Sequence, residues 1–580
     1  MSIHTADNAA ANTTPPSDSM NPPLCTLPIN TADSGFYHGL NKFVTVSAKV
    51  IVAAIILWAI LFPVQANETL AVANATLIRE FAGWYVYLVA LLMLVAFTLA
   101  VIPQSGSLRL GAPGEEPEFG RFSWFAMLFG AGIGIGMLTY STGEPLSHFA
   151  TNPDTIRGVV EPMSAETIQS AYRYTFLHWG FAAWATYALV GLAVGYVAYR
   201  RGLPLTIRSS LAPLFGSRMS GFAGHLVDLV AVVATILGVA VTMGLGVEQF
   251  VAGLSRLGLG NWLLNAEGTA SVAAIIVALV VLVGASTVSA ISGVGRGIKW
   301  LSNINMALSI LLLTVFLVFG AGLGGLTLLF TSVTDYLVSL PADALTLWTA
   351  DGTATGDALA QWQLDWSVFY WAWWIAFAPF VGMFIARISR GRTIREYMFG
   401  VVLVPSLMCF IWMALAGGTA IELVLSGADS GAILGANISD QLYATLSTLF
   451  GSGVAALLSG VVVLLLMTYL ITSADSAILI VNTINGAGGE GEDGAERRHH
   501  ILFWGAAIAL VVGSMLVLGG IDAIRITMII GALPFSVVVA LMAISIVKAV
   551  IYDVRRKRGG VETHCPVILA RAAEGPGLAG

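Results

Sequence analysis

Apolar runs long enough to cross a membrane recur along almost the whole chain, and this feature limits the fold more than any other. A helix needs about 20 mostly apolar residues to span the hydrocarbon core of a bilayer. Such runs occupy about 44–64, 82–102, 122–142, 172–198, 226–254, 270–290, 303–330, 366–386, 398–424, 452–484, 501–519 and 526–551. The sequence therefore predicts an all-α polytopic membrane protein with twelve transmembrane helices.

The composition agrees with this class. Of the 580 residues, 57% are hydrophobic and only 10% are charged, and the mean hydropathy is +0.84. These values lie outside the range of soluble globular domains. Cys25, Cys409 and Cys565 are too few and too scattered to predict a disulfide framework or a metal site. We expect no cofactor and no nucleic-acid partner.

The positions of the basic residues predict the orientation. With the N-terminus inside, twelve spans place most of the 27 Lys and Arg residues on the cytoplasmic side, as the positive-inside rule requires. The exceptions are Arg79, Arg157, Arg173, Arg256 and Arg525. We therefore expect a multi-pass protein of the plasma membrane, the inner membrane in a bacterium, with both termini in the cytoplasm.

Polar segments flank and interrupt the helical domain. Residues 1–40 are rich in Asn, Thr, Ser and Pro and predict a disordered cytoplasmic tail. Residues 41–552 hold the twelve helices, with an amphipathic connector on the outer surface at 331–363. Residues 553–580 form a short basic cytoplasmic tail. Its RRKR cluster is able to bind anionic lipid headgroups, although a simple positive-inside anchor is the favoured interpretation.

Two of the apolar runs carry aromatic residues well below the membrane surface. Trp366–Tyr397 places its rings over about three helical turns, deeper than an interface belt requires. These rings are Trp366, Phe369, Tyr370, Trp371, Trp373, Trp374 and Phe377. The run 172–198 adds Trp179, Trp184 and Tyr187. A stripe in one helix is more often packing, but two such helices can form a cage for a quaternary ammonium group.

A glycine run and a hydroxyl pair are candidates for an ion site. Gly130, Gly132, Gly134 and Gly136 predict either unwound backbone with carbonyls that face a cation, or close helix packing, with equal weight. In the run 452–484, Thr472 and Ser473 either bond to the preceding turn or ligate sodium.

Few ionisable residues lie inside the apolar runs. Glu248 and Asp475 are the two most interior acids and are functional candidates, although Asp475 could equally cap an interrupted helix. His178 is the only histidine near the middle of a run, and it has no clear partner. An enzyme needs a nucleophile with a base, or a metal site, so we do not expect enzymatic activity.

Four motifs together resemble the betaine/choline/carnitine transporter family over residues 42–552. They are FYWAWWIAFAPFVGMFIARISRGRTIRE at 369–396, the glycine run with GEPL at 143–146, HW with the following Trp184 and Tyr187, and TSADS at 472–476. The resemblance implies two five-helix inverted repeats, about 120–330 and 364–552. It also implies a central site between the repeats.

Carried over by position, the family's aromatic box and sodium sites fall on specific residues. The implied substrate-binding set is Trp179, Trp184, Tyr187, Trp373, Trp374, Phe377, Gly132 and Gly134. The implied sodium set is Gly130, Ile133, Tyr469, Thr472 and Ser473, with Thr235 and Phe380 for a second ion. Three departures matter. Phe377 stands where betaine carriers of the family usually have Trp, Val239 replaces a threonine of the second sodium site, and Glu248 has no place in the family pattern.

The resemblance implies a secondary active transporter that works by alternating access. Its substrate would be a quaternary ammonium or sulfonium compatible solute such as glycine betaine or choline, and its coupling ion would be sodium. Two alternatives stay open: a sodium-independent substrate/product exchanger of carnitine type, and an importer of dimethylsulfoniopropionate or ectoine. Members of the family are commonly trimers, so the resemblance also implies a homotrimer.

Overall fold

The computed structural model describes residues 21–132, 134–292, 295–489 and 498–573, and these residues form helices and no strand. The longer helices are α1 (Lys42–Leu61), α2 (Pro63–Val101), α4 (Arg121–Gly132), α5 (Gly134–Ala150), α7 (Thr167–Trp179), α8 (Phe181–Arg201), α10 (Phe222–Arg256), α11 (Val272–Ser292), α12 (Gly295–Phe319), α13 (Gly322–Asp343), α15 (Phe369–Ile388), α16 (Ile394–Trp412), α19 (Ser452–Asn485) and α20 (Arg498–Arg558). The short helices are α3 (Pro103–Gly106), α6 (Pro153–Ile156), α9 (Ala212–Phe215), α14 (Ala354–Gln363), α17 (Gly418–Leu425), α18 (Gln441–Leu449) and α21 (Pro566–Ala573).

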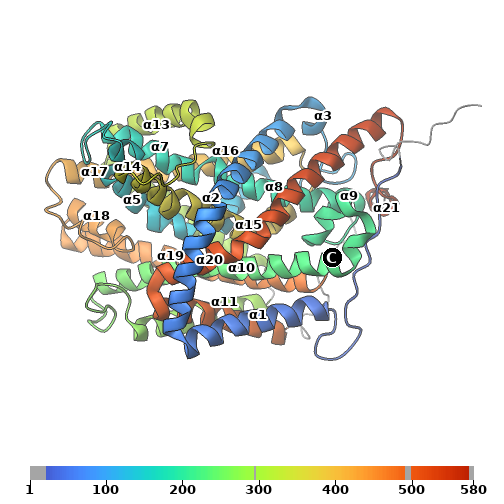
Figure 1. Cartoon of the computed structure of the whole chain (residues 1–580), viewed down its shortest axis with the longest axis horizontal. Helices are drawn as coiled ribbons and strands as arrows, with labels where there is room; N and C mark the ends of the chain where they lie inside the picture. Colours follow the sequence, from blue (N-terminus) through green and yellow to red (C-terminus); the bar gives the residue numbers. More distant parts are fainter. Residues whose placement is uncertain (1–20, 133, 293–294, 490–497, 574–580) are drawn as a thin grey trace, which may run out of the picture.

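The long helices lie between two ends that the short elements cover. In Figure 1, α14, α17 and α18 lie at one end of the molecule, and α3, α9 and α21 lie at the other. By length and hydropathy, 11 helices of the described chain could cross a membrane. The expected all-helical, multi-pass membrane protein is therefore confirmed.

The helices are interrupted at places that the sequence analysis treats as continuous. The predicted run 122–142 is divided into α4 and α5, each too short to be counted as a span. The two runs predicted at 501–519 and 526–551 form the single element α20, which kinks where Gly519 and Gly520 leave helical geometry. These two differences, with α13 counted as a span, separate the 11 candidates from the predicted twelve.

The prediction of unwound backbone is wrong at the four glycines of this run. Gly130 and Gly132 lie in α4, and Gly134 and Gly136 lie in α5, so all four are helical. Residue 133 between them lies outside the described residues. The close-packing alternative holds for Gly134 and Gly136, because a Cβ on either would come within 3 Å of an aromatic ring.

The seventh predicted span and the connector after it have different boundaries. α12 ends at Phe319, not near residue 330, and α13 begins at Gly322. Gly322 has a φ of +52°, a backbone conformation that glycine adopts at little cost. The predicted connector 331–363 is thus the second half of α13 followed by α14.

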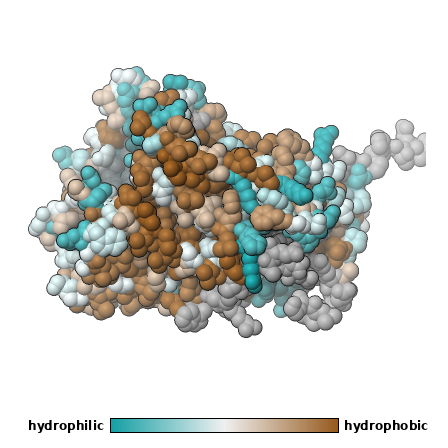
Figure 2. Space-filling view, turned by 90° about the horizontal axis from the view of Figure 1, so that it is seen from below, coloured by the Kyte–Doolittle hydropathy of each residue, from teal (hydrophilic) through white to brown (hydrophobic). Residues whose placement is uncertain are grey.

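The outer surface is apolar where lipid would contact it. Figure 2 shows a broad continuous area of hydrophobic residues with hydrophilic residues towards the ends of the molecule. Apolar side chains that are largely exposed include Val280 of α11 (69%) and Leu457 of α19 (70%). Large exposed apolar areas are unfavourable in water but cost nothing against lipid tails.

α15 lies at the centre of the fold and packs against α8, α10 and α20. Small residues permit these close approaches. A Cβ on Gly191 of α8 would lie 2.7 Å from the carbonyl oxygen of Gly382 on α15. A Cβ on Gly238 of α10 would lie 2.9 Å from the carbonyl carbon of Ala376. Backbones in contact at glycines are typical of helix pairs that pack in membranes.

A buried ionic cluster joins the ends of α8 and α20. Asp553 is fully buried and accepts hydrogen bonds from Tyr196 (2.7 Å) and Arg556 (2.8 Å). Arg200 and Arg201 lie 3.7 and 3.5 Å from its carboxylate. Removing a partner from such a buried group would leave an uncompensated charge, so this cluster holds the ends of α8 and α20 together.

The two terminal segments are joined by a disulfide. Cys25 bonds to Cys565, and the backbone N–H of Cys565 donates to the carbonyl of Arg200. The expectation that the cysteines form no disulfide is therefore wrong for this pair, while Cys409 is free and buried. Leu27 and Leu40 are also buried, so residues 21–40 of the predicted tail lie against the helical body.

This pairing predicts a thiol count. Protein purified without reductant and then denatured should react with alkylating reagent at one cysteine, Cys409, and at three after reduction. The variant Cys565→Ser should expose two thiols without reduction, because Cys25 loses its partner. Intact mass after alkylation measures the number directly. Three reactive thiols in the unreduced wild-type protein would contradict the pairing.

Candidate functional site

The candidate site begins at a break between α7 and α8. Gly180 separates them with a non-helical ψ of −134°. The break frees backbone groups that would otherwise bond along the helix. The N–H of Phe181 donates to the hydroxyl of Tyr336 (3.0 Å), and the carbonyl of His178 accepts from the indole N–H of Trp374 (3.0 Å). The break is thus held by aromatic residues of α13 and α15.

The break brings the predicted aromatic residues of three helices together. Trp179 is the last residue of α7, and its ring centroid lies 5.3 Å from that of Trp374, edge to face. Tyr187 of α8 lies 6.1 Å from Trp374 and 5.7 Å from Trp184, again edge to face. The four rings are buried. We call these four residues the aromatic cluster.

The remaining aromatic predictions flank the aromatic cluster. Trp373 stacks on Trp374 with centroids 4.9 Å apart, and its indole N–H donates to Thr242 of α10 (3.3 Å). Phe377 lies 6.4 Å from Tyr187. The hydroxyl of Tyr187 is buried and has no hydrogen-bond partner among the described residues. It is therefore a polar group of the cluster that a ligand oxygen could bind.

Glycine positions beside the aromatic cluster leave space for its rings. A Cβ on Gly136 would lie 2.8 Å from Trp373 and 3.2 Å from Trp179. Gly134 leaves space for a ring of α19, since a Cβ at this position would lie 2.4 Å from the ring of Tyr469. Gly132, which belongs with Gly134 to the implied substrate-binding set, is the last residue of α4. α5 therefore contacts both the aromatic cluster and the predicted sodium residues.

A buried carboxylate, Glu144 of α5, lies directly behind the aromatic cluster. It accepts hydrogen bonds from the indole of Trp179 (2.5 Å) and the hydroxyl of Tyr370 on one oxygen. On the other it contacts His178 (2.6 Å) and His148 (3.3 Å). We call these five residues the Glu144 network. The expectation that His178 has no partner is wrong.

The same donors have a spacing that would suit a metal ion. One ligand atom each of Glu144, His148 and His178 lies within 4.8 Å of the others. However, the two carboxylate oxygens already take part in four hydrogen bonds, and His178 bonds to Ser367 through its second nitrogen (3.0 Å). Both carboxylate oxygens and both nitrogens of His178 are thus engaged without an ion, and the second nitrogen of His148 has no hydrogen-bond partner among the described residues.

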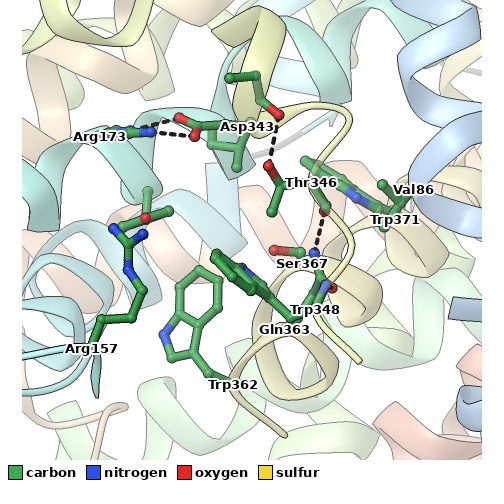
Figure 3. Close-up of a pocket in the computed structure, with 13 residues that line it drawn as sticks. Val86, Arg157, Arg173, Asp343, Thr346, Trp348, Trp362, Gln363, Ser367 and Trp371 are labelled. Carbon is green, nitrogen blue, oxygen red and sulfur yellow. Dashed lines mark hydrogen bonds and ion pairs between the residues drawn. The ribbon is translucent and has the colours of Figure 1, made fainter. Parts of the chain in front are cut away.

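A pocket of about 130 Å³ adjoins the Glu144 network. Figure 3 shows the ion pair of Arg173 with Asp343 on one side of it and tryptophan rings on the other. Ser367, which bonds His178, lines this pocket, and so do Trp362, Trp348 and Trp371. Ser367 lies in a π-helical turn, Leu364–Val368, an irregularity that is frequent at functional sites.

The predicted sodium residues of α19 lie together near α4 and α5. Tyr469, Thr472 and Ser473 are buried, and α19 packs against both helices. The Thr472 hydroxyl is within reach of the carbonyls of Thr468 (3.0 Å) and Tyr469 (3.1 Å). Its proton is thus bonded inside the helix, which leaves oxygen lone pairs for a cation. Gly130 lies in α4, and Ile133 lies outside the described residues.

The residues of the predicted second sodium site are buried on neighbouring helices, α10 and α15. Thr235 of α10 donates its hydroxyl hydrogen bond to the carbonyl of Ala231 (2.8 Å). Phe380 of α15 lies 5.1 Å from Phe377. Val239 is buried one turn after Thr235 and offers no oxygen from its side chain. The second ion stays a prediction.

The two acids that the sequence ranked highest have other contacts. Glu248 accepts the backbone N–H of Ala270 (2.9 Å), just before α11 begins, so it ties a loop to α10. Asp475 accepts from Ser289 of α11 (2.5 Å), and its other oxygen has no partner among the described residues. Neither is as buried as Glu144, which is fully enclosed. Glu144 lies just outside the predicted run 122–142, so the ranking of acids inside the runs left it out.

Comparison with known proteins gives a consistent result. The sequence pattern of the betaine/carnitine/choline family of transporters matches residues 43–555. The glycine betaine transporter OpuD of Bacillus subtilis is 37% identical over 501 residues, 86% of this chain and 92% of that protein. The osmo-independent choline transporter BetT1 of Acinetobacter baylyi is 35% identical over 539 residues, 93% of this chain and 97% of that protein. A glycine betaine/proline/choline/ectoine transporter of Vibrio parahaemolyticus is 33% identical over 517 residues, 88% and 86% of the two chains.

The contact between Gly134 and Tyr469 predicts a loss of stability. The variant Gly134→Ala forces a methyl group into the Tyr469 ring, whose hydroxyl is held by Ser309 (3.0 Å). Overpacking of this kind costs about 1–3 kcal/mol, so the melting temperature of the purified protein should fall. Gly284→Ala in α11 is the matched control, because its Cβ meets nothing within 4 Å. Equal melting temperatures for the two variants would argue against the contact.

Proposed function

The chain belongs to the betaine/carnitine/choline family of transporters, and from this premise we propose that it imports a small quaternary ammonium solute together with sodium. As a member of this family it is a transporter and not an enzyme. Glycine betaine and choline are the substrates that the names of its relatives support. A sulfonium solute or ectoine remains an alternative substrate.

The observation that carries the proposal is the meeting of Trp179, Trp184, Tyr187 and Trp374 from α7, α8 and α15. A trimethylammonium group donates no hydrogen bonds and is bound through ring faces. Each desolvated ring contributes on the order of 0.5–2 kcal/mol. Several rings together therefore bind the substrate with useful affinity, and this affinity is still low enough for the substrate to dissociate.

Sodium coupling is supported by the position of the α19 hydroxyls. We place the ion between Thr472, Ser473 and the carbonyl of Tyr469 on α19 and backbone carbonyls near Gly130 and Ile133. α5 contacts both this region and the aromatic cluster, so ion binding and substrate binding would order the same helix. Coupling between two sites is reciprocal, so sodium raises substrate affinity in this scheme. Each inward charge gains about 2.3 kcal/mol per 100 mV of membrane potential.

The finer architecture belongs to the same proposal. We place α4 with α5 as one interrupted span, divide α20 at Gly519 and Gly520, and treat α13 as a surface connector. This gives twelve spans, of which the first two, α1 and α2, precede two five-helix inverted repeats. Interrupted helices near the centre are typical of such transporters. We place both termini in the cytoplasm and the protein in the plasma membrane, as a homotrimer whose basic tail faces lipid headgroups.

Sodium dependence is tested by uptake of radiolabelled glycine betaine into proteoliposomes. With an inward sodium gradient we expect accumulation, and with potassium in place of sodium we expect little. Thr472→Ala should raise the sodium concentration for half-maximal uptake about tenfold, the effect of losing about 1.4 kcal/mol. Thr483→Ala on the same helix is the control, since its hydroxyl also bonds a preceding carbonyl, that of Leu479.

The same assay separates the exchanger from the symporter. Uptake that ignores sodium but increases when unlabelled substrate is preloaded would contradict the coupling proposal and favour exchange. A wild-type sodium dependence of uptake in Thr472→Ala would contradict the proposed sodium site on α19.

The aromatic cage is tested by Trp374→Leu. The variant removes a ring that contacts Trp179 and Tyr187, so uptake should fall at least about tenfold while the protein still reaches the membrane. Trp84→Leu is the control, because that indole also donates a hydrogen bond, to Ser536, but lies outside the aromatic cluster. Uptake by Trp374→Leu at the level of Trp84→Leu would exclude the cage.

A further inference from the structure

The Glu144 network places a buried carboxyl group behind the rings of the aromatic cluster. The indole of Trp179 can only donate, and the hydroxyl of Tyr370 donates to the same oxygen of Glu144. The two histidines contact the other oxygen through one nitrogen each. With the histidine tautomers that donate through these nitrogens, four donors surround Glu144, which is fully buried, and this arrangement matches its unprotonated form.

The surroundings fit neutral histidines and therefore a net negative charge. The second nitrogen of His178 can accept the hydroxyl proton of Ser367 (3.0 Å). The second nitrogen of His148 is buried without a hydrogen-bond partner among the described residues, which suits a lone pair and not a buried N–H. Arg525 of α20 pairs with the exposed Asp522 at 3.6 Å and lies over the ring of Phe369, 4.0 Å from its centroid.

Trp179 connects this charge to the proposed substrate cage. Its indole edge donates to Glu144 at 2.5 Å, and its ring lies 5.3 Å from that of Trp374. When the N–H or O–H group of an aromatic side chain donates to an anion, the ring gains electron density on its faces. This strengthens the attraction of the ring for a cation. Tyr370 repeats this arrangement and stacks 5.3 Å from Trp374. The carboxylate of Glu144 thus influences the proposed cage through its rings and does not contact the substrate.

We propose that Glu144 is a specificity-determining residue, which fixes Trp179 and Tyr370 by their polar edges and gives the cage the negative charge that selects a quaternary ammonium group over an uncharged group of the same shape. This inference rests on the proposed function. Glu144 is a positioning residue, because it acts through the rings and not on the substrate directly.

The test compares glycine betaine with 3,3-dimethylbutanoate, in which carbon replaces the quaternary nitrogen. Purified protein in proteoliposomes takes up labelled glycine betaine, and unlabelled glycine betaine or the carbon analogue competes. The ratio of the two inhibition constants measures selection for the positive charge alone. A defect in folding or in general fit changes both constants and leaves their ratio unchanged.

Glu144→Gln should lower this ratio about tenfold, the effect of removing one charge roughly 10 Å from the bound cation at an effective dielectric constant of about 20. The constant for 3,3-dimethylbutanoate should stay near its wild-type value. Glu144→Asp keeps the charge and should keep most of the ratio. Glu248→Gln is the control, because it neutralises another buried glutamate, one that accepts a hydrogen bond from the Ala270 backbone and lies outside the Glu144 network.

Tyr370→Phe supplies a second measurement if Glu144→Gln does not fold. It keeps the ring and the carboxylate but removes the hydroxyl between them, so the ratio should fall by a smaller factor. A wild-type ratio in Glu144→Gln, or in Tyr370→Phe where only that variant folds, overturns the inference and leaves the cage intact. Wild-type protein that does not distinguish the two compounds overturns the proposed function as well.

Discussion

The need to bond every backbone polar group within an apolar body governs this structure. Lipid offers no hydrogen bonds, so a helix can break only where side chains replace its lost partners. The break at Gly180 satisfies this condition through Trp374 and Tyr336. A second irregularity, the π-helical turn Met413–Gly417, does so through the Tyr172 hydroxyl on the Met413 carbonyl (3.0 Å). Buried aromatic residues with a polar edge therefore stabilise these two irregularities.

This use of aromatic residues also prepares a binding site. When the indole edge of Trp374 bonds the His178 carbonyl, its orientation is fixed and its faces remain apolar. Fixed ring faces are what a cage for a methylated cation needs, because little freedom is then lost on binding. The interactions that repair the break between α7 and α8 thus also orient the rings of the aromatic cluster.

The sequence predicted those parts of the fold and site that depend on local spacing. Apolar runs located most of the helices, and Trp184 with Tyr187, three residues apart, meet as helical geometry requires. The meeting of Trp179 with Trp374 across α7 and α15 required the family resemblance, since no local pattern joins positions so far apart. The break at Gly180 was not predicted, because a single glycine in an apolar run is compatible with a continuous helix. Its partners, Tyr336 and Trp374, are distant in sequence.

Glu144 and the disulfide were missed for the same physical reason. Glu144 stands between a glycine and a proline, which reads as a helix end, and its four donors come from α5, α7 and α15. Only His148, four residues later, is a local signal. Cys25 and Cys565 are 540 residues apart. Burial and pairing of this kind depend on the tertiary structure, which the order of residues along one helix does not contain.

The placement of the negative charge has a consequence for transport. A carboxylate in direct contact with a substrate cation would form a strong ion pair in an apolar site, and release would be slow. In the proposed arrangement four donors hold the carboxylate of Glu144, and rings separate it from the cage, so its attraction is attenuated by distance and by its own hydrogen bonds. Attraction of this strength selects the charged group without trapping it. Because the donors belong to three different helices, a movement of α5 relative to α15 would change ring orientation and charge together, and so would alter affinity during alternating access.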